Sequence, residues 1–461
     1  MKSNLVAAHA LGVLFASIAL GCAGAAPTDE ETRSTEAALS PTLDLHGVGE
    51  TVHLSGAIDR TNPFFQSLGT NGRTCNSCHD ARAGWTMTPV LASVLFELTG
   101  GTSTIFKPHD EANRPDADVS TVEARRAAYS MLLTKGLTRF TRVPPATADY
   151  AVIAVDDPYG FSTPTQISNF RRPPPVANVA LEASITWTGG PGEMRTLLMN
   201  IMNGGTKFHA QATTDLPLET RAAAADFMLG LFFAQSYDFA AGKLDEVGAF
   251  GGPTALSTQP FYIGINALTG DSKTGAPFDN EAFEVFSAWE DLDTKHAGRA
   301  TRQTMARAAI ARGEEAFYTI QFDISGVPGL NDDLGQPVIR GTCTTCHNTP
   351  NVGSGSVFRM LDEGVADAAL RTPDLPLITV QNKLTGETKQ TTDLGRGLST
   401  GKWADLGKVK VPTLRGLAAR APYFHNGSAA NLHEVLEFYR KRFGVDFKGA
   451  EADLIAFLGA I

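Results

Sequence analysis

Two pentads of the form Cys-x-x-Cys-His constrain this chain more than any other feature. They are Cys75-Asn-Ser-Cys78-His79 and Cys343-Thr-Thr-Cys346-His347. This spacing is the attachment signature of c-type haem, in which both thiols bind one porphyrin and the adjacent imidazole becomes the fifth ligand of the iron. A Cys-x-x-Cys pair alone could also be a zinc half-site or a redox dithiol. Because both pairs carry the histidine and no cysteine is left to complete a zinc finger, the sequence predicts two covalently bound haem c groups.

The fifth cysteine, Cys22, ends an N-terminal apolar run. Residues 1–22 have the pattern of a secretory signal, and the run is too short for an ordinary spanning helix. Residues 19–22, Ala-Leu-Gly-Cys, resemble a bacterial lipoprotein box in which Cys22 would be lipidated, whereas ordinary cleavage after residues 23–25 is the alternative. We therefore expect an exported protein of the periplasm or cell envelope, attached to a membrane through a lipid anchor only.

Composition sets wider bounds on the chain. Its 461 residues are enough for two or three domains, and a hydrophobic content of 43% can form proper cores. The formal net charge of −10 argues against nucleic acid and anionic membrane surfaces as partners. The 45 glycines and 25 prolines indicate many loops around short helices.

The predicted organisation is a flexible linker over residues 23–45, an N-terminal haem domain over 46–252 and a C-terminal haem domain over 253–461. The pentads lie far apart, so each domain should hold its own haem. We expect a mainly α fold with long loops and few short strands. The periodicity of apolar residues predicts helices over 121–135, 218–241, 280–292, 302–318, 431–443 and 449–459, and a strand over 150–155.

Two kinds of sequence segment resemble known proteins. Residues 63–69 and 313–317, which precede the two pentads, resemble the lead-in segment of a class I cytochrome c domain. Residues 411–428, Val-Pro-Thr-Leu-Arg-Gly-Leu-Ala-Ala-Arg-Ala-Pro-Tyr-Phe-His-Asn-Gly-Ser, resemble the C-terminal signature of bacterial di-haem cytochrome c peroxidases, a family that includes MauG. Residues 171–178 and the Thr-Trp pair at 186–187 resemble a second block of that family. The resemblance implies two class I cytochrome c-like haem domains packed together, but fold and cofactor do not fix the substrate.

The resemblance implies that peroxide reacts at the N-terminal haem and that the C-terminal haem receives or stores electrons. Trp187 falls on the family tryptophan between the two porphyrins, where a ring can relay an electron, although it could also be a core residue. Tyr439 falls on the position of the sixth ligand of the C-terminal haem, which is Met in typical peroxidases and Tyr in MauG. A phenolate favours ferric iron, and the alternative is packing on the porphyrin edge. Met360 and His425 are rival ligands, and His425 is better suited to hydrogen bonding near the propionates or the domain interface.

At the N-terminal haem the family pattern is altered. Pro164 occupies the position of the distal histidine, so the iron should be open at rest, although His109 could still approach it. Lys207 occupies the position of the catalytic Glu, and His209 is the candidate replacement proton carrier, with Asn200 at the position of a nearby amide. A surface histidine on a Gly-rich turn is the alternative reading of His209.

The family also binds calcium between its domains through an Asn side chain and two carbonyls. The carbonyls would be those of Arg420 and Pro422, but the Asn position holds Arg172, which cannot ligate a cation. Calcium is therefore doubtful, and an arginine cross-link is the expected substitute.

These observations predict an oxidoreductase of the cytochrome c peroxidase type. It would reduce hydrogen peroxide, or another small oxidant, with electrons from a small redox protein passed between two haems. A MauG-like or oxygenase-type di-haem oxidase of a protein or organic substrate is one alternative. A non-catalytic electron-transfer protein is the other.

Overall fold

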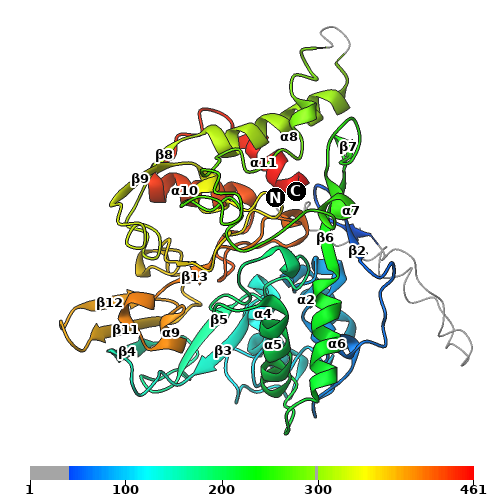
Figure 1. Cartoon of the computed structure of the whole chain (residues 1–461). Coiled ribbons are helices and arrows are strands. Elements are labelled where there is room, and N and C mark those ends of the chain that lie inside the picture. The colour runs from blue at the N-terminus through cyan, green and yellow to red at the C-terminus, as the bar shows by residue number, and fades with distance from the viewer. Residues whose placement is uncertain (1–40, 296–299) are drawn as a thin grey trace, which may run out of the picture.

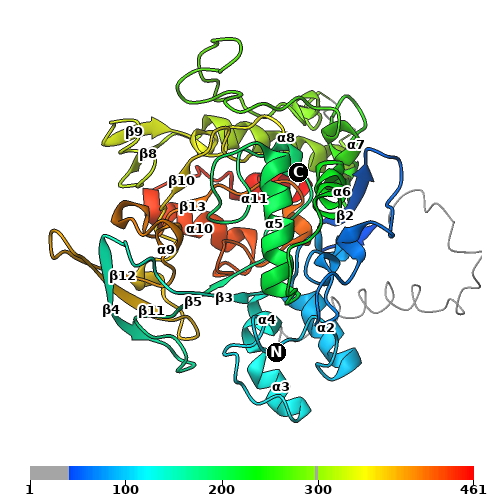
Figure 2. The same ribbon diagram turned by 60° about the horizontal axis from the view of Figure 1, so that its bottom comes forward.

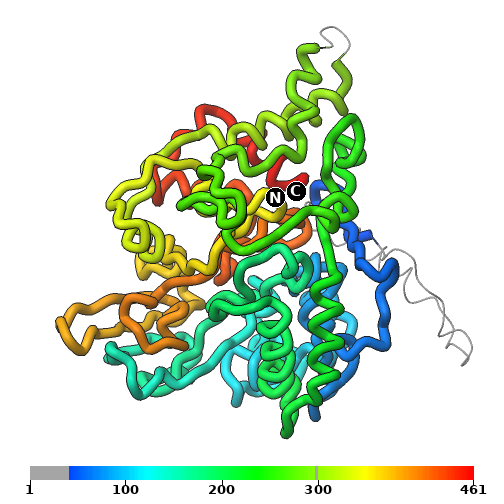
Figure 3. Tube along the Cα trace, viewed as in Figure 1, coloured from blue at the N-terminus to red at the C-terminus, as the bar shows by residue number. Residues whose placement is uncertain are grey.

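The structure is a computed structural model that describes residues 41–295 and 300–461. The predicted signal, Cys22 and most of the predicted linker lie outside these residues. The described chain forms two lobes, one above the other in Figure 1. The N-terminal half builds most of the lower lobe and the C-terminal half most of the upper one, although residues 377–400 lie at the lower left of Figure 1, beside the N-terminal half. The tube in Figure 3 shows the chain passing from the lower to the upper lobe along its right-hand side. No helix of the described part is both long and apolar enough to cross a membrane.

Helices form the body of both lobes. They are α2 Pro89–Thr99, α3 Val122–Ala128, α4 Ser130–Lys135, α5 Met194–His209, α6 Leu218–Leu229, α7 Gly252–Leu256, α8 Arg302–Thr319, α9 Gly397–Thr400, α10 Leu432–Phe443 and α11 Glu451–Ala460. Figure 2 shows α5 as the long front helix of the lower lobe, with α3 and α4 below it. Local sequence sets their ends: Thr301 and Thr304 form a capping box at the start of α8, and Gly444, in the left-handed region, ends α10.

The strands are short and form small antiparallel sheets. They are β1 Thr42–Leu43, β2 Gly47–His53, β3 Thr138–Arg142, β4 Tyr150–Asp156, β5 Ile167–Arg171, β6 Leu231–Asp238, β7 Gly242–Lys243, β8 Phe322–Ser325, β9 Val338–Gly341, β10 Met360–Leu361, β11 Leu377–Asn382, β12 Thr388–Thr391 and β13 Val409–Lys410. One sheet has the order β1-β2-β6-β7, and another has the order β12-β11-β4. The second sheet joins the halves of the chain, because β4 pairs with β11.

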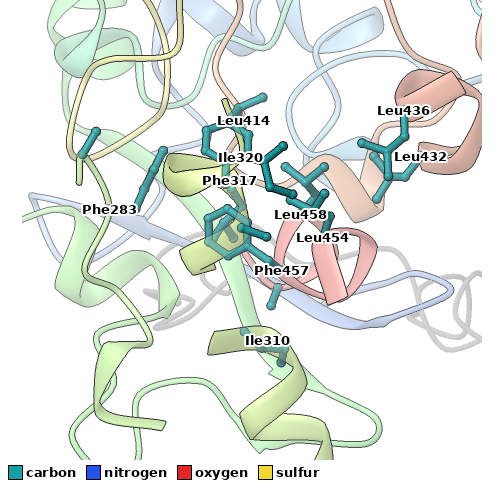
Figure 4. Close-up of a cluster of buried hydrophobic side chains, with 14 of the residues drawn as sticks. Phe283, Ile310, Phe317, Ile320, Leu414, Leu432, Leu436, Leu454, Phe457 and Leu458 are labelled. Carbon is teal, nitrogen blue, oxygen red and sulfur yellow. The ribbon is translucent and has the colours of Figure 1, made fainter. Parts of the chain in front are cut away.

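The upper lobe is organised by a close crossing of α8 and α11. A Cβ atom on Gly313 would lie 1.9 Å from the carbonyl oxygen of Asp453, so only glycine allows the two backbones to approach this closely. Phe317, one turn later, packs its ring at 5.7 Å from that of Phe457, and Phe283 completes this aromatic cluster, which is drawn in Figure 4. The segment 313–317 is thus the point at which the two helices meet.

The lower lobe repeats this device in its own lead-in segment. A Cβ atom on Gly69 would lie 1.9 Å from the carbonyl oxygen of Ala210, which directly follows α5. Phe64, Trp85 and Phe227 form a fully or almost fully buried aromatic cluster between this segment and α6. Both lead-in segments therefore bring a glycine against the backbone of a helical element.

Most of the predicted elements are confirmed, and two are wrong. The predicted helix over 218–241 ends at Leu229, and residues 231–238 form β6 because they pair with β2. The predicted helix over 280–292 contains only the short 3-10 turn Ser287–Trp289, since the carboxylate of Glu314 accepts the backbone N–H groups of Val285 and Phe286 in place of a helical carbonyl. The helix over 121–135 is present as two pieces that meet at Tyr129.

Candidate functional site

The second pentad forms a short 3-10 turn with its imidazole held in a fixed orientation. The turn covers Cys343–Thr345, and Thr342 and Thr345 cap it reciprocally. His347 Nδ1 donates a hydrogen bond to the carbonyl oxygen of Gly353 at 2.5 Å. A carbonyl can only accept, so Nδ1 carries the proton and Nε2 keeps its lone pair for a metal.

The first pentad has the same local design. Its 3-10 turn covers Cys75–Ser77, and His79 Nδ1 donates to the carbonyl oxygen of Trp85 at 3.3 Å. Burial lowers the pKa of both axial-candidate imidazoles to about 4, so they are neutral near pH 7. Each pentad thus presents an unprotonated Nε2 beside two thiols.

The four pentad thiols are free and half-buried. None of them is in a disulfide bond, and burial raises the pKa of Cys75 and Cys343 to about 12 and that of Cys78 to about 11. In residues 41–295 and 300–461 no three His, Cys, Asp or Glu side chains gather where they could hold a metal ion. The donor set of each pentad therefore fits thioether attachment of haem with one imidazole ligand.

A largely apolar cavity lies over the second pentad. It measures about 1280 Å³, counted with the space open to solvent. Its lining is mostly aromatic and aliphatic, as a porphyrin requires. The side chains of interest that line it are Cys343, Cys346, His347, Glu363, Trp187, His425 and Tyr439. The structure therefore brings together every residue that the sequence analysis assigned to the C-terminal haem except Met360, which is buried in β10 and does not line this cavity.

Tyr439 lies on α10 among aromatic rings. Its ring stacks on Phe443, with centroids 6.2 Å apart, and meets Phe438 edge-on. Burial, aided by the nearby charge of Glu363, raises the pKa of the phenol well above its usual value. Ligation and edge packing both remain compatible with this placement, and the role of Tyr439 as a sixth ligand stays a prediction.

His425 occupies the region between the lobes. Its ring lies edge-on to Trp187, with centroids 5.9 Å apart, and its Nε2 lies 3.7 Å from Asp393 Oδ2. Asp393 is itself held by Arg171 through a buried bidentate pair at 2.7 Å. Burial lowers the pKa of His425 to about 4. This neutral imidazole lies where the two halves of the chain meet, and its hydrogen-bonding role stays a prediction.

Trp187 is fixed by both halves of the chain. Its Nε1 donates to the carbonyl oxygen of Arg172 at 2.6 Å, and its own carbonyl accepts the backbone N–H of Lys410 at 2.9 Å. Lys410 forms a buried ion pair with Glu182 from the other half. The indole therefore has a defined position at the edge of the C-terminal cavity.

Arg172 joins the same interface. Its guanidinium donates to the carbonyl oxygens of Arg420 and Pro422, and to that of Met87 at 2.9 Å. These include both carbonyls that the resemblance assigned to calcium, so the arginine cross-link is confirmed. Burial lowers the pKa of Arg172 to about 9, and the side chain stays charged at neutral pH. The guanidinium of Arg172 thus binds the two carbonyls that the resemblance assigned to the calcium of the family.

The predicted residues of the N-terminal site do not all come together. His209 ends α5, and its Nδ1 lies 2.7 Å from Asp110 Oδ2. Asn200 lies on the exposed face of the same helix, and Lys207 makes a surface ion pair with Asp215. Pro164 lies in an exposed turn between β4 and β5.

Two polar contacts hold the side chain of His109 in place. Its Nε2 lies 3.1 Å from the carbonyl oxygen of Phe208 and 3.2 Å from Asp110 Oδ1. The sequence analysis missed Asp110 and Arg73, two buried charged residues of this region. A signal was present, since Arg73 stands two residues before the first pentad and Asp110 follows His109 directly.

Comparison with known proteins gives relatives that are named as peroxidases. No family model matches the chain. It is 31% identical over 136 residues to a cytochrome-c peroxidase, IdrP2, of Denitromonas iodatirespirans. This match covers 26% of this chain and 36% of the relative. It is 34% identical over 138 residues to cytochrome c551 peroxidase of Nitrosomonas europaea, which covers 28% of this chain and 35% of that protein.

A second peroxidase of Denitromonas iodatirespirans, IdrP1, is 31% identical over 164 residues, or 41% of its length. The chain therefore spans little more than a third of the curated relatives that it matches. The predicted resemblance to bacterial cytochrome c peroxidases is confirmed by these relatives, whereas the likeness to MauG stays a prediction.

Proposed function

We propose that this chain is an exported di-haem c-type oxidoreductase that reduces hydrogen peroxide with electrons from a small redox protein. The observation that carries this proposal is that the chain has two pentads, in each of which the imidazole Nδ1 is hydrogen-bonded to a backbone carbonyl, and relatives named as cytochrome-c peroxidases. Two class I cytochrome c-like domains, one in each lobe, are the proposed architecture. The overall reaction joins one hydrogen peroxide, two electrons and two protons to give two water molecules.

The residues have separate tasks in this proposal. Bound haem would supply the redox-active iron, held by His79 in the lower lobe and by His347 in the upper one. His209 accepts and returns the peroxide proton beside the first pentad. Trp187, fixed between the lobes, provides an aromatic path for electrons from the C-terminal cavity.

The first experiment counts covalent haem and measures turnover. Protein matured in a haem-ligating host should have the mass of the mature polypeptide plus two haems. It should oxidise a reduced small c-type cytochrome when hydrogen peroxide is added. A protein with two haems that neither reacts with peroxide nor oxidises the cytochrome would contradict the peroxidase proposal and support an electron carrier.

A MauG-like or oxygenase-type oxidase is the second candidate, and Tyr439 in the C-terminal cavity favours it. A phenolate ligand lowers the reduction potential of haem iron and stabilises its oxidised forms. Electron paramagnetic resonance of the resting ferric protein, compared with Tyr439→Phe, tests this point. A C-terminal haem signal that changes in the variant, together with slow cytochrome turnover, supports the oxidase, while an unchanged signal removes the tyrosine ligand.

Export and lipid anchoring at Cys22 belong to the same proposal. Cys22→Ser should leave the haem content unchanged and move the protein from the detergent phase to the aqueous phase after phase separation. Equal partitioning of the wild type and the variant would contradict a lipid anchor at this residue.

A further inference from the structure

Asp110 is a completely buried carboxylate beside the first pentad, and three basic side chains meet it. Arg73 Nη1 lies 2.7 Å from Oδ1, and His209 Nδ1 lies 2.7 Å from Oδ2. His109 Nε2 lies 3.2 Å from Oδ1. Although burial disfavours the charged form, the hydrogen bonds from the two histidines and the charge of Arg73 lower the pKa of Asp110. The carboxylate is therefore ionised across the neutral pH range.

The contact with His209 fixes the proton on its ring. An ionised carboxylate can only accept hydrogen bonds, so the proton of a neutral His209 must sit on Nδ1. Nε2 then has its lone pair free, which is the state of a general base. The side chain of His209 is 52% exposed, so Nε2 can exchange protons with water.

The same cluster ties His209 to the haem-binding segment. Arg73 Nη1 also donates to the backbone carbonyl of His209 at 3.1 Å, and Arg73 stands two residues before Cys75. Both the ring and the backbone of His209 thus have a fixed place relative to the first pentad.

We propose that Asp110 is a positioning residue that holds His209 in the Nδ1–H form, so that Nε2 takes up the proton of hydrogen peroxide and returns it. This inference rests on the proposed peroxidase function. One oxygen of peroxide, the first, loses its proton to Nε2. The same proton passes to the other oxygen, which leaves as water when the O–O bond breaks. Bound haem would supply the two electrons, and the donor protein would restore them. The first oxygen, which remains after the O–O bond breaks, takes two further protons from solvent and becomes the second water molecule.

The pairing of carboxylate and imidazole also explains how this chain can work without the family Glu, whose position is held by Lys207. A carboxylate alone would have to sit at the reacting oxygen. Here the carboxylate of Asp110 is buried in the lobe and contacts Nδ1 of His209. The opposite nitrogen of that ring, Nε2, is the atom that meets the reacting oxygen in this proposal. Lys207 itself forms an exposed ion pair with Asp215, which argues against Lys207 as the proton carrier.

The test combines kinetics with a direct observation of the ring proton. Asp110→Asn keeps the shape of the side chain, and Arg73 retains Glu111 as an ion-pair partner. We expect the rate constant for the reaction with hydrogen peroxide to fall by roughly 10²–10⁴-fold in Asp110→Asn and in His209→Gln, which is the usual contribution of general acid–base catalysis. The double variant should lose no more than either single variant, because both changes remove one function.

Asp116→Asn is the matched control, since Asp116 lies in the same segment but makes a surface ion pair with Arg114. It should react with peroxide within about twofold of the wild type. If Asp110→Asn also reacts at the wild-type rate while His209→Gln is slow, Asp110 has no positioning role. If His209→Gln is itself unaffected, the proton is carried by another group and the inference fails.

The second readout does not depend on activity. In the fully reduced protein treated with carbon monoxide, proton–nitrogen NMR of ¹⁵N-labelled histidines should show His209, assigned by its absence in His209→Gln, as the Nδ1–H tautomer. Its loss in Asp110→Asn supports the inference even if the wild type fails to reduce peroxide, in which case the proposed function alone fails. An Nε2–H tautomer in the wild type overturns the inference, whether or not the variants fold.

Discussion

The crossing of α8 and α11 gives the sharpest stability prediction, because one methyl group decides it. In Gly313→Ala the new Cβ atom would lie 1.9 Å from the carbonyl oxygen and 2.5 Å from the carbonyl carbon of Asp453. Both are backbone atoms of a helix, so no side chain can rotate away. The helices must separate by on the order of 1 Å or more to reach ordinary contact distances.

The cost follows from what the crossing holds together. Alanine gains about 1 kcal/mol over glycine from helix propensity. Overpacking costs about 1–3 kcal/mol, and occasionally more. Separation of the helices also loosens the contacts of Phe317 with Phe457, so we expect the upper end of this range. The net loss in the free energy of unfolding should be about 2 kcal/mol or more.

The assay is denaturant unfolding of the haem-loaded protein, with Gly204→Ala as the matched control. Gly204 lies within α5, and a Cβ atom there meets nothing within 4 Å. The two substitutions should therefore change stability in opposite directions, with Gly204→Ala stabilising by up to about 1 kcal/mol. Because Phe317 also lines the C-terminal cavity, Gly313→Ala should disturb the spectrum of that haem more than the other. A Gly313→Ala protein as stable as the wild type would refute the account of this crossing.

Three further predictions concern two residues of the interface and one buried acid. Arg172→Asn should make thermal stability respond to Ca²⁺, since oxygen atoms then converge where the guanidinium was, and an equal response of the wild type would contradict this. Trp187→Phe should slow electron transfer between the haems in rapid-mixing spectroscopy, whereas Trp403→Phe, outside the cavity, should not; equal rates in both would remove the relay. Burial raises the pKa of Glu314 to about 7 from 4.5, so the folded protein holds this proton longer than the unfolded one, and its contribution to stability falls as the pH rises through that window. Over these 2.5 units (7 − 4.5) Glu314→Gln should gain about 3 kcal/mol relative to the wild type, and a constant difference between pH 4.5 and 7 would oppose the assignment.

The sequence predicted those parts of the molecule that depend on local signals. The pentads define their own turns, and the amphipathic segments over 302–318, 431–443 and 449–459 are helices with bounds within a few residues of the prediction. The arginine cross-link to the carbonyls of Arg420 and Pro422 was also predictable, because a motif fixed their positions, whereas its third partner, the carbonyl of Met87, was not predicted.

Long-range partners account for what the sequence did not predict. Residues 231–238 are apolar enough for a buried helix, but they pair with β2, whose residues lie 178 to 191 positions earlier in the chain. Residues 280–292 lose their helix because Glu314, on α8, takes two of their N–H groups. The partner of His209 is Asp110, and no periodicity connects two residues 99 positions apart. In each of these cases the deciding contact forms only in the folded chain.

The interface between the lobes shows why buried charges gather around Trp187. Arg171 with Asp393 and Lys410 with Glu182 are buried pairs that cross between the halves of the chain. Such pairs contribute little net stability, because the cost of removing two charges from water offsets their attraction. They are nevertheless directional, since a small displacement leaves a charge unpaired in the interior. An apolar interface could slide by an ångström at little cost, whereas this one cannot. Trp187 is held by a hydrogen bond from its indole to the N-terminal half and by one from the C-terminal half to its backbone carbonyl. The proposed passage of electrons between two haems requires a fixed separation, and that is the property which such an interface supplies.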